Sequence, residues 1–204
     1  MKIGVINYGM GNLHSVIRKL KILKVDYVIV DSSDGIKECD KIILPGVGHF
    51  GKAMENLKRL QLIGPLSTHA VIDKKPILGI CLGMQVMLTD SEEGTTNGLD
   101  WIAGKIKKFK VDDKLRFKIP QMGWNSIEIM KDSQLMTGLN NQSEFYFVHS
   151  FHIAEIAQKN ILNITYYENK FVSAIQKENI YGVQYHPEKS FEAGIQLIRN
   201  FIEL

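Results

Sequence analysis

The side chain with the clearest chemical potential is Cys81, which lies in the run Gly79-Ile80-Cys81-Leu82-Gly83. An apolar stretch at residues 76–80 precedes it, and a helix-like pattern follows it. Glycines two residues before and after a nucleophile are typical of a sharp strand-to-helix turn that holds the nucleophile at the head of a sheet. The N-terminus of a helix also favours a thiolate over a thiol. The alternative for Cys81 is that it is only a small buried residue, as most free cysteines are. Cys39, which has no flanking glycines, fits that alternative.

A base for this thiol is offered by the run Tyr185-His186-Pro187-Glu188, which closes a second apolar stretch. A thiol nucleophile needs a base, and the base needs an acceptor that orients it. A histidine and a carboxylate two residues apart at the end of a strand can point the same way, so Glu188 can accept from the imidazole of His186. The chain has six histidines, and this pair alone would be no more than a surface pair.

A third run, Leu44-Pro45-Gly46-Val47-Gly48, also closes an apolar stretch. Attack of a thiolate on an amide creates an oxyanion, which preorganised backbone N–H groups must stabilise. The glycines on both sides of Val47 leave its N–H free to turn into a pocket. An ordinary turn is the alternative, because most Pro-Gly pairs are turns.

The elements around these runs indicate an α/β protein. Strands and helices alternate in the first part of the chain, which is typical of a parallel sheet with helices on both faces. We expect strands at residues 3–6, 27–30, 41–44 and 76–81, and helices that begin after Asn12 and cover residues 53–60, 65–73 and 83–88. After a polar loop at residues 90–98, short strands are expected at 101–109, 124–129, 145–151, 161–167, 171–176 and 180–185, followed by a helix capped by Ser190. No repeat or linker interrupts the chain, so we predict one domain over residues 1–204.

The composition argues against several classes of function. Of the 204 residues, 45% are hydrophobic and 23% are charged, as in ordinary globular proteins. The net charge of +3 is small, and the densest basic run, residues 105–110, is too short for a nucleic-acid surface. No apolar stretch is long enough to cross a bilayer, and no Cys/His spacing suggests a metal site. Two cysteines and a strand-like first segment favour a reduced, cytoplasmic setting. We expect no metal, cofactor, nucleic-acid or membrane partner.

The three runs occur together in the order and spacing of the triad-type, or class I, glutamine amidotransferases, and the chain resembles that family over its whole length. Four further runs resemble the glutaminase subunits of imidazole glycerol phosphate synthase: Tyr8-Gly9-Met10-Gly11-Asn12, Met122-Gly123-Trp124-Asn125, Tyr146-Phe147-Val148-His149-Ser150 and His186-Pro187-Glu188-Lys189-Ser190. The resemblance implies a flavodoxin-like α/β fold. It has a mainly parallel central sheet, helices on both faces and a strand-rich C-terminal half.

The resemblance also implies roles for individual residues. Cys81 would attack the side-chain amide of L-glutamine and form a thioester, His186 would move the protons, and Glu188 would orient His186. The backbone N–H groups of Val47 and Leu82 would form the oxyanion hole. The residues implied to bind the amino-acid end of glutamine are Gly48, Gln85, Ser150 and Phe151. Those implied to contact the partner are Asn12, Trp124 and Lys189. That partner would be a (β/α)8-barrel synthase subunit, which forms a heterodimer with the chain and uses the ammonia.

Three features leave the pathway open between histidine biosynthesis and a paralogous one. Asn7 stands where aspartate is common in the histidine-pathway subunits, and Gln121 stands where histidine is common. Residues 98–104 resemble paralogues that supply ammonia to a sugar amidotransferase in surface-polysaccharide synthesis. Two further alternatives are a stand-alone cysteine hydrolase and a non-catalytic binding module of the same fold. The extended match beyond the turn at Cys81 argues against the hydrolase, and the intact triad argues against the binding module.

The nucleophile can be tested directly. Cys81→Ser should lower glutamine hydrolysis by about a thousand-fold or more, because the thioester route is lost, as when other enzymes lose their nucleophile. Cys39→Ala should leave the rate close to that of the parent. The measurement is glutamate release by each purified variant, and a Cys81 variant that still turns over at the parent rate would refute the assignment.

Overall fold

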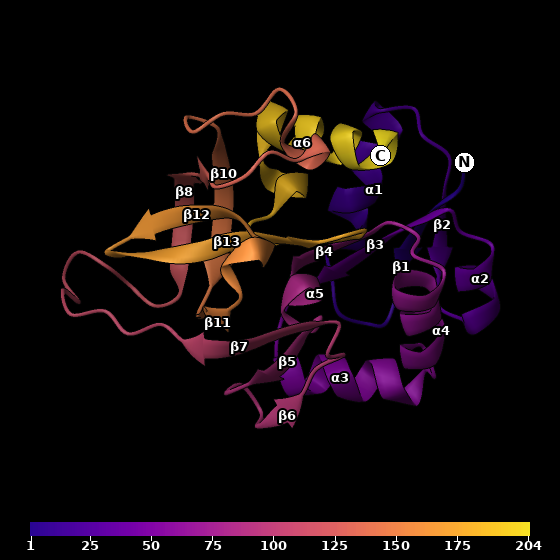
Figure 1. Cartoon of the computed structure of the whole chain (residues 1–204), viewed down its shortest axis with the longest axis horizontal. Coiled ribbons are helices and arrows are strands. Elements are labelled where there is room, and N and C mark those ends of the chain that lie inside the picture. The colour runs from indigo at the N-terminus through magenta and orange to yellow at the C-terminus, as the bar shows by residue number, and fades with distance from the viewer.

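A twelve-stranded mixed sheet runs through the computed structural model, which describes residues 1–204 (Figure 1). Its strands lie in the order β2-β1-β3-β4-β14-β13-β11-β7-β5-β6, and β12 and β9 extend it from β13. The bounds of these strands are β1 Ile3–Ile6, β2 Tyr27–Val30, β3 Lys41–Gly46, β4 Ile77–Cys81, β5 Leu88–Ser91, β6 Thr96–Asn97, β7 Ile102–Lys108, β9 Glu128–Ile129, β11 Phe151–Ile156, β12 Ile161–Tyr167, β13 Asn169–Lys177 and β14 Ile180–Val183.

The half of the sheet that carries the predicted nucleophile is parallel. Strand β1 pairs in parallel with β2 and β3, and β4 pairs in parallel with β3 and β14. Every residue of β1, β3, β4 and β14 is buried, which explains their nearly continuous apolar sequences. The predicted α/β fold with a parallel central sheet is confirmed in this half.

Helices cover both faces of the parallel half, as predicted (Figure 1). On one face, α1 and α6 pack on a core that includes Val16, Leu197 and Phe201. On the other, α2, α3 and α4 pack on a core that includes Phe50 and Leu66. The helices are α1 Leu13–Ile22, α2 Ser33–Lys37, α3 Phe50–Arg59, α4 Ile63–Ser67, α5 Leu82–Gln85 and α6 Phe191–Glu203, and a π-helical turn, Thr68–Ile72, follows α4.

The C-terminal half is strand-rich, as predicted, but two predicted strands divide between sheets. The strand expected at residues 124–129 becomes β8, Gln121–Ser126, in a small two-stranded sheet, and β9, in the large sheet. Residues 145–151 were expected as one strand, whereas β10, Glu144–His149, and β11 belong to different sheets. His149 pairs with Gln121 of β8 in the two-stranded sheet. Phe151 pairs with Lys108 of β7 in the large sheet. Only Ser150 lies between them, so the chain changes its pairing partner within one residue.

Two local predictions are wrong. The helix expected at residues 83–88 is the single turn α5, and the chain continues as β5 and β6 through the predicted polar loop. The reason is tertiary: Leu88 is fully buried and pairs with Ile102 of β7, which fixes an extended chain.

Ser190 precedes α6 but does not cap it with its side chain, so the predicted cap is also wrong. Its hydroxyl instead donates to the His186 carbonyl at 2.6 Å and accepts from the Tyr146 N–H at 3.0 Å.

The last helix is held by a buried lysine. Lys41, at the start of β3, is 7% exposed, and its ammonium donates to the Ile202 and Phe201 carbonyls at 2.5 and 3.4 Å. The last carbonyls of a helix have no partner within it, and a positive charge there also suits the helix dipole. Burial lowers the pKa of Lys41.

Lys41→Met should therefore lower the free energy of unfolding by about 1–3 kcal/mol, because the carbonyls lose their donor while the apolar stem is kept. Lys37→Met is the matched control: Lys37 is exposed and forms a 2.9 Å ion pair with Asp34, and such a pair contributes at most about 1 kcal/mol. Urea unfolding of both variants measures the difference. If the two variants are equally stable, Lys41 does not hold the helix.

Candidate active site

Cys81 occupies a strained turn between β4 and α5. Its backbone has φ 54° and ψ −111°, a conformation that residues with a side chain rarely adopt and that costs roughly 1–3 kcal/mol. The neighbouring glycines permit a very close backbone approach. A Cβ atom on Gly83 would lie 1.8 Å from the Leu44 carbonyl oxygen, and one on Gly79 would lie 2.6 Å from the Gly83 oxygen. The predicted need for glycine at both positions thus has a steric cause.

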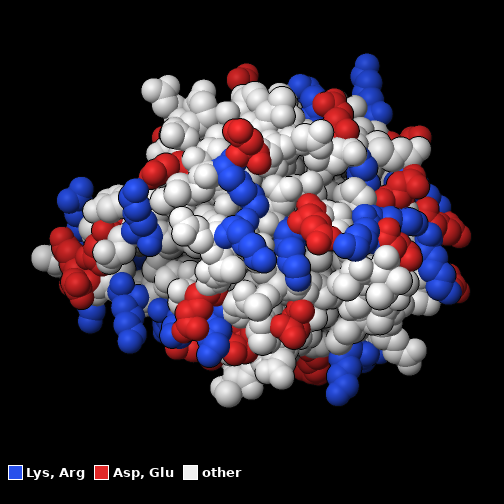
Figure 2. Space-filling view, viewed as in Figure 1, with Lys and Arg blue, Asp and Glu red and all other residues white.

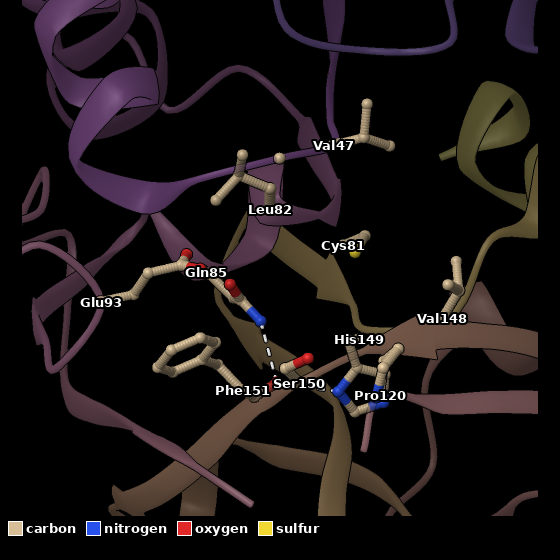
Figure 3. A pocket seen from close by; sticks show the side chains of 11 residues that line it. Val47, Cys81, Leu82, Gln85, Glu93, Pro120, Val148, His149, Ser150 and Phe151 are labelled. Carbon is tan, nitrogen blue, oxygen red and sulfur yellow. Dashed lines mark hydrogen bonds between the residues drawn. The ribbon is translucent and has the colours of Figure 1, made fainter. Parts of the chain in front are cut away.

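Cys81 opens into a cavity of about 270 Å³. Figure 3 shows its sulfur between Val47 and Leu82 on one side and His149 and Ser150 on the other. The structure places all six residues predicted for the oxyanion hole and the glutamine subsite around this cavity: Val47, Gly48, Leu82, Gln85, Ser150 and Phe151. They come from the end of β3, from α5 and from the β10–β11 junction, segments that are far apart in the sequence.

His186 and Glu188 form a buried pair next to Cys81. The Nδ1 atom of His186 lies 2.7 Å from a carboxylate oxygen of Glu188, and the residues are 1% and 7% exposed. Both follow β14, and Glu188 lies in a short 3-10 turn, Pro187–Lys189, that begins with proline. The bond from Ser190 to the His186 carbonyl fixes this turn. The predicted orientation of His186 by Glu188 thus has the required geometry.

The charge state of His186 is set by its neighbours. Burial lowers its pKa, but the adjacent Cys81 and then Glu188 outweigh burial and raise the pKa to about 10. An imidazolium is therefore favoured at neutral pH, as in a thiolate–imidazolium pair. The Nε2 atom of His186 makes no hydrogen bond. Cys81 is nevertheless close enough to raise the pKa of His186. Loose contacts of this kind are common in active sites without substrate.

Two backbone amides border the sulfur. Val47 lies just beyond β3, outside any helix or strand, and its N–H donates no hydrogen bond within the chain. Leu82 is the first residue of α5, where an amide has no acceptor inside the helix. Neither amide therefore has an acceptor within the chain. Because α5 has only one turn, its dipole favours a thiolate less than the dipole of the longer predicted helix would.

The floor of the cavity is a hydrogen-bonded cluster around one carbonyl. The Phe151 oxygen accepts from Gln85 Nε2 at 3.1 Å and from His149 Nδ1 at 2.8 Å (Figure 3). Gln85 Nε2 also donates to the side-chain oxygen of Gln184 at 2.9 Å. These bonds hold the β10–β11 junction against α5.

Sequence reasoning missed two residues of this site. Gln184 donates to the sulfur of Cys81 at 3.5 Å, and Glu93 lines the cavity and accepts from the Phe50 N–H at 2.7 Å. Gln184 could have been found from strand alternation, because it lies two residues before His186 and shares its face. Glu93 lies in the predicted polar loop, where no sequence signal distinguishes it.

The residues predicted to meet a partner lie outside the cavity. Trp124 is 40% exposed and stacks on the exposed Phe191 with ring centroids 4.9 Å apart. The Lys189 ammonium lies 5.3 Å from the centre of the Tyr146 ring, which packs against Trp124. Trp124 and Lys189 thus share one surface. Asn12 caps α1 by accepting from the Ser15 N–H at 3.3 Å, and no hydrogen bond joins it to that surface.

The chain has no group of three or more His, Cys, Asp or Glu residues arranged to hold a metal ion. No helix has both the length and the apolar character needed to span a membrane.

His149 makes stability depend on pH. It is packed among Phe109, Phe147 and Phe171, and burial lowers its pKa to about 3. The folded chain therefore keeps His149 neutral, whereas the unfolded chain binds a proton below about pH 6.5. The contribution of His149 is complete above that pH and is lost as the pH falls from 6.5 towards 3.

His149→Asn, which keeps a donor near the Nδ1 position, should flatten the fall in the free energy of unfolding below pH 6.5. The expected reduction in slope is about 1.4 kcal/mol per pH unit. Denaturant unfolding between pH 5 and pH 7 (a range set by the ordinary pKa of about 6.5) measures it, with His14→Asn on the surface as control. Parallel pH profiles for parent and His149 variant would contradict the prediction.

Comparison with known proteins identifies the family. The family model for class-I glutamine amidotransferases matches residues 4–204. Three similar relatives are the imidazole glycerol phosphate synthase subunits HisH 2 of Methanococcus maripaludis (47% identical, 98% of both chains covered), HisH of Methanocaldococcus jannaschii (45%, 99% of both) and HisH 1 of Campylobacter jejuni (44%, 99% of this chain and 100% of the relative).

Solved structures agree on the fold. The structure of PurLQS from Thermotoga maritima superposes with a TM-score of 0.77 at 17% identity, covering 99% of this chain and 97% of the other. A glutamine amidotransferase crystal structure gives 0.75 at 14% identity, covering 98% and 97%. The family match over nearly the whole chain and the 47% identity to a relative show that the chain belongs to the class-I glutamine amidotransferases.

Proposed function

We propose that this chain is the glutaminase subunit of an imidazole glycerol phosphate synthase and passes ammonia from glutamine to a barrel-type cyclase. The observation that carries the chemistry is the position of Cys81. It stands on a strained turn, opens into a cavity bordered by the amides of Val47 and Leu82, and has the His186–Glu188 pair beside it. The names of the relatives, which cover almost the full chain, support the pathway.

In the first half of the reaction, the Cys81 thiolate attacks the side-chain amide carbon of glutamine. The amides of Val47 and Leu82 stabilise the oxyanion that forms. The His186 imidazolium then gives its proton to the departing nitrogen, so that ammonia leaves and a glutamyl thioester remains. Glu188 keeps the imidazole oriented and stabilises its charged form.

In the second half, neutral His186 takes a proton from a water molecule that attacks the thioester. The same two amides stabilise the second oxyanion, which expels the Cys81 thiolate and releases glutamate. The product acid loses its remaining proton to solvent, and the thiolate–imidazolium pair is restored.

The cavity suits the amino-acid end of glutamine. Its polar lining includes Gln85 and Ser150, and Glu93 is the one carboxylate that lines it. A carboxylate there complements the ammonium group of the substrate. The volume of about 270 Å³ is close to the lower range of small-molecule sites, roughly 300 Å³ and above.

The surface that contains Trp124, Tyr146, Lys189 and Phe191 is the proposed docking face for the cyclase. Aromatic residues are enriched at the centres of protein interfaces, and here two large rings are stacked in the open. Lys189 directly follows Glu188 in the chain, so a residue of this face is adjacent in sequence to a residue of the triad. Asn12 remains a predicted contact.

A second candidate is a paralogous subunit that supplies ammonia to a sugar amidotransferase. Asn7 and Gln121 favour it, and two relatives carry numbers in their names, HisH 1 and HisH 2. Gln121 is buried and donates to Asn125 at 2.8 Å inside the small sheet, so it leaves the chemistry at Cys81 unchanged. The two candidates therefore share the glutaminase mechanism and differ in the partner.

The partner should control the rate. The free chain should hydrolyse glutamine slowly, because the peptide at Gly46-Val47-Gly48 is expected to complete the oxyanion hole only when the partner is bound. A barrel cyclase loaded with its acceptor should then raise glutamate release by roughly 10²–10³, the effect of one well-placed oxyanion donor. Lys189→Ala should reduce this stimulation more than the basal rate. Lys58→Ala, which changes an exposed residue of α3, should change neither.

Glutamate release is measured with and without each purified synthase and its ligand. A fast free chain that ignores both synthases would contradict the proposal. Stimulation by a sugar-pathway synthase but not by the histidine-pathway cyclase would assign the second candidate.

A further inference from the structure

A buried amide lies against the nucleophile and has no role in the reaction described above. Gln184 directly follows β14 and is completely buried, and its Nε2 atom lies 3.5 Å from the sulfur of Cys81. Sulfur is a larger acceptor than oxygen, so its hydrogen bonds are longer. Gln184 belongs neither to the triad nor to the predicted oxyanion hole or glutamine subsite.

The backbone of Gln184 is held on both sides. Its N–H donates to the Ser173 carbonyl of β13 at 2.8 Å. The next residue, Tyr185, is fully buried, and its ring stacks on Phe145 with centroids 4.1 Å apart. The Tyr185 hydroxyl also accepts from Asn163 Nδ2 at 3.1 Å. These contacts fix the segment from which the Gln184 side chain reaches the sulfur.

The hydrogen bonds of the cavity floor decide which end of the Gln184 amide faces the sulfur. The Phe151 carbonyl can only accept, so the amide nitrogen of Gln85 must face it, at 3.1 Å (Figure 3). The same nitrogen donates to the side-chain oxygen of Gln184 at 2.9 Å. Because its oxygen is bound in this way, Gln184 directs its Nε2 hydrogens towards Cys81. The sulfur therefore receives an N–H donor of fixed orientation.

The groups next to the sulfur decide its charge, because the surface supplies no strong field. Basic and acidic side chains are interspersed on the face shown in Figure 2, and the net charge is only +3. The titratable groups around the sulfur are His186, Glu188, Tyr8, His149 and Glu93. Burial raises the pKa of Tyr8 and lowers the pKa of His149 to about 3, so both stay neutral. The two carboxylates oppose a negative sulfur, and a neutral donor offsets them without adding a charge.

We propose that Gln184 is a positioning residue of the triad: its side-chain N–H binds the sulfur of Cys81 and stabilises it as a thiolate. This role rests on the proposed function of Cys81 as the nucleophile. A hydrogen bond to an ionised acceptor is roughly twice as strong as one between neutral groups, so the donor favours the thiolate over the thiol. The same bond acts again when the thioester breaks down, because the departing sulfur regains its negative charge.

The pH dependence of Cys81 alkylation by iodoacetamide tests the proposal without glutamine. Gln184→Met removes the donor and keeps the size of the side chain, so the midpoint of the alkylation profile should rise by about one pH unit. Gln184→Asn keeps a buried amide on a shorter stem and should shift the midpoint in the same direction. The matched control is Gln176→Met, at the other end of the β13–β14 pair, where Nε2 donates to the Glu178 carbonyl at 3.4 Å. Its midpoint should equal that of the parent.

Cys39 reports whether each variant is folded. It is fully buried, and its thiol donates to the Gly35 carbonyl at 3.1 Å, so it should stay unmodified in a folded chain. Peptide mass spectrometry measures the modification of both cysteines in the same sample. A midpoint that rises only in chains with modified Cys39 reflects unfolding and would overturn the proposal.

Glutamate release gives a second measurement. In Gln184→Met, the acid side of its pH profile should move upward by about as much as the alkylation midpoint, which a purely structural role would not cause. An unchanged midpoint in the folded Gln184 variants, or an equal rise in Gln176→Met, would contradict the role of Gln184. Retained hydrolysis in Cys81→Ser would instead refute the nucleophile, so the two failures are distinguishable.

Discussion

The active site depends on a backbone contact in which no side chain can take part. The turn after Cys81 packs so closely on the end of β3 that a single methyl group on Gly83 would overlap the Leu44 carbonyl. This contact sets the distance between the sulfur and the segment that contains Val47. Because both segments end parallel strands of one sheet, the oxyanion donors and the nucleophile are fixed by sheet geometry rather than by side-chain packing.

The charged groups of the site are stabilised as a unit. Glu188 and His186 are buried, and a buried charge is tolerated only when it is paired and hydrogen-bonded. Each member therefore supports the other: a negative neighbour favours the imidazolium, and the imidazole Nδ1 donates to one oxygen, Oε1, of the carboxylate. The same bonds tie the 3-10 turn to β14, so the protonation of the site and the local fold are linked.

The sequence predicted the parallel half of the sheet, the turn at Cys81 and the residues around the cavity. These features depend on local patterns, such as apolar runs that end in glycine or in His-Pro-Glu. The prediction failed where tertiary contacts outweigh local preference. Residues after Gln85 have a helical pattern, but burial of Leu88 beside β7 makes them a strand. The hydroxyl of Ser190 donates to the His186 carbonyl instead of capping α6, and no sequence rule distinguishes these two roles.

The division of the strand at Ser150 has a mechanical consequence. Residues 148–151 line the glutamine cavity, and they are also the joint between the small sheet, which carries Trp124, and the large sheet, which carries Cys81. The cavity therefore lies where the two sheets meet, beside the bond from the His186 N–H to the Tyr146 carbonyl that joins them. Any change in the angle between the two sheets would change the walls of this cavity.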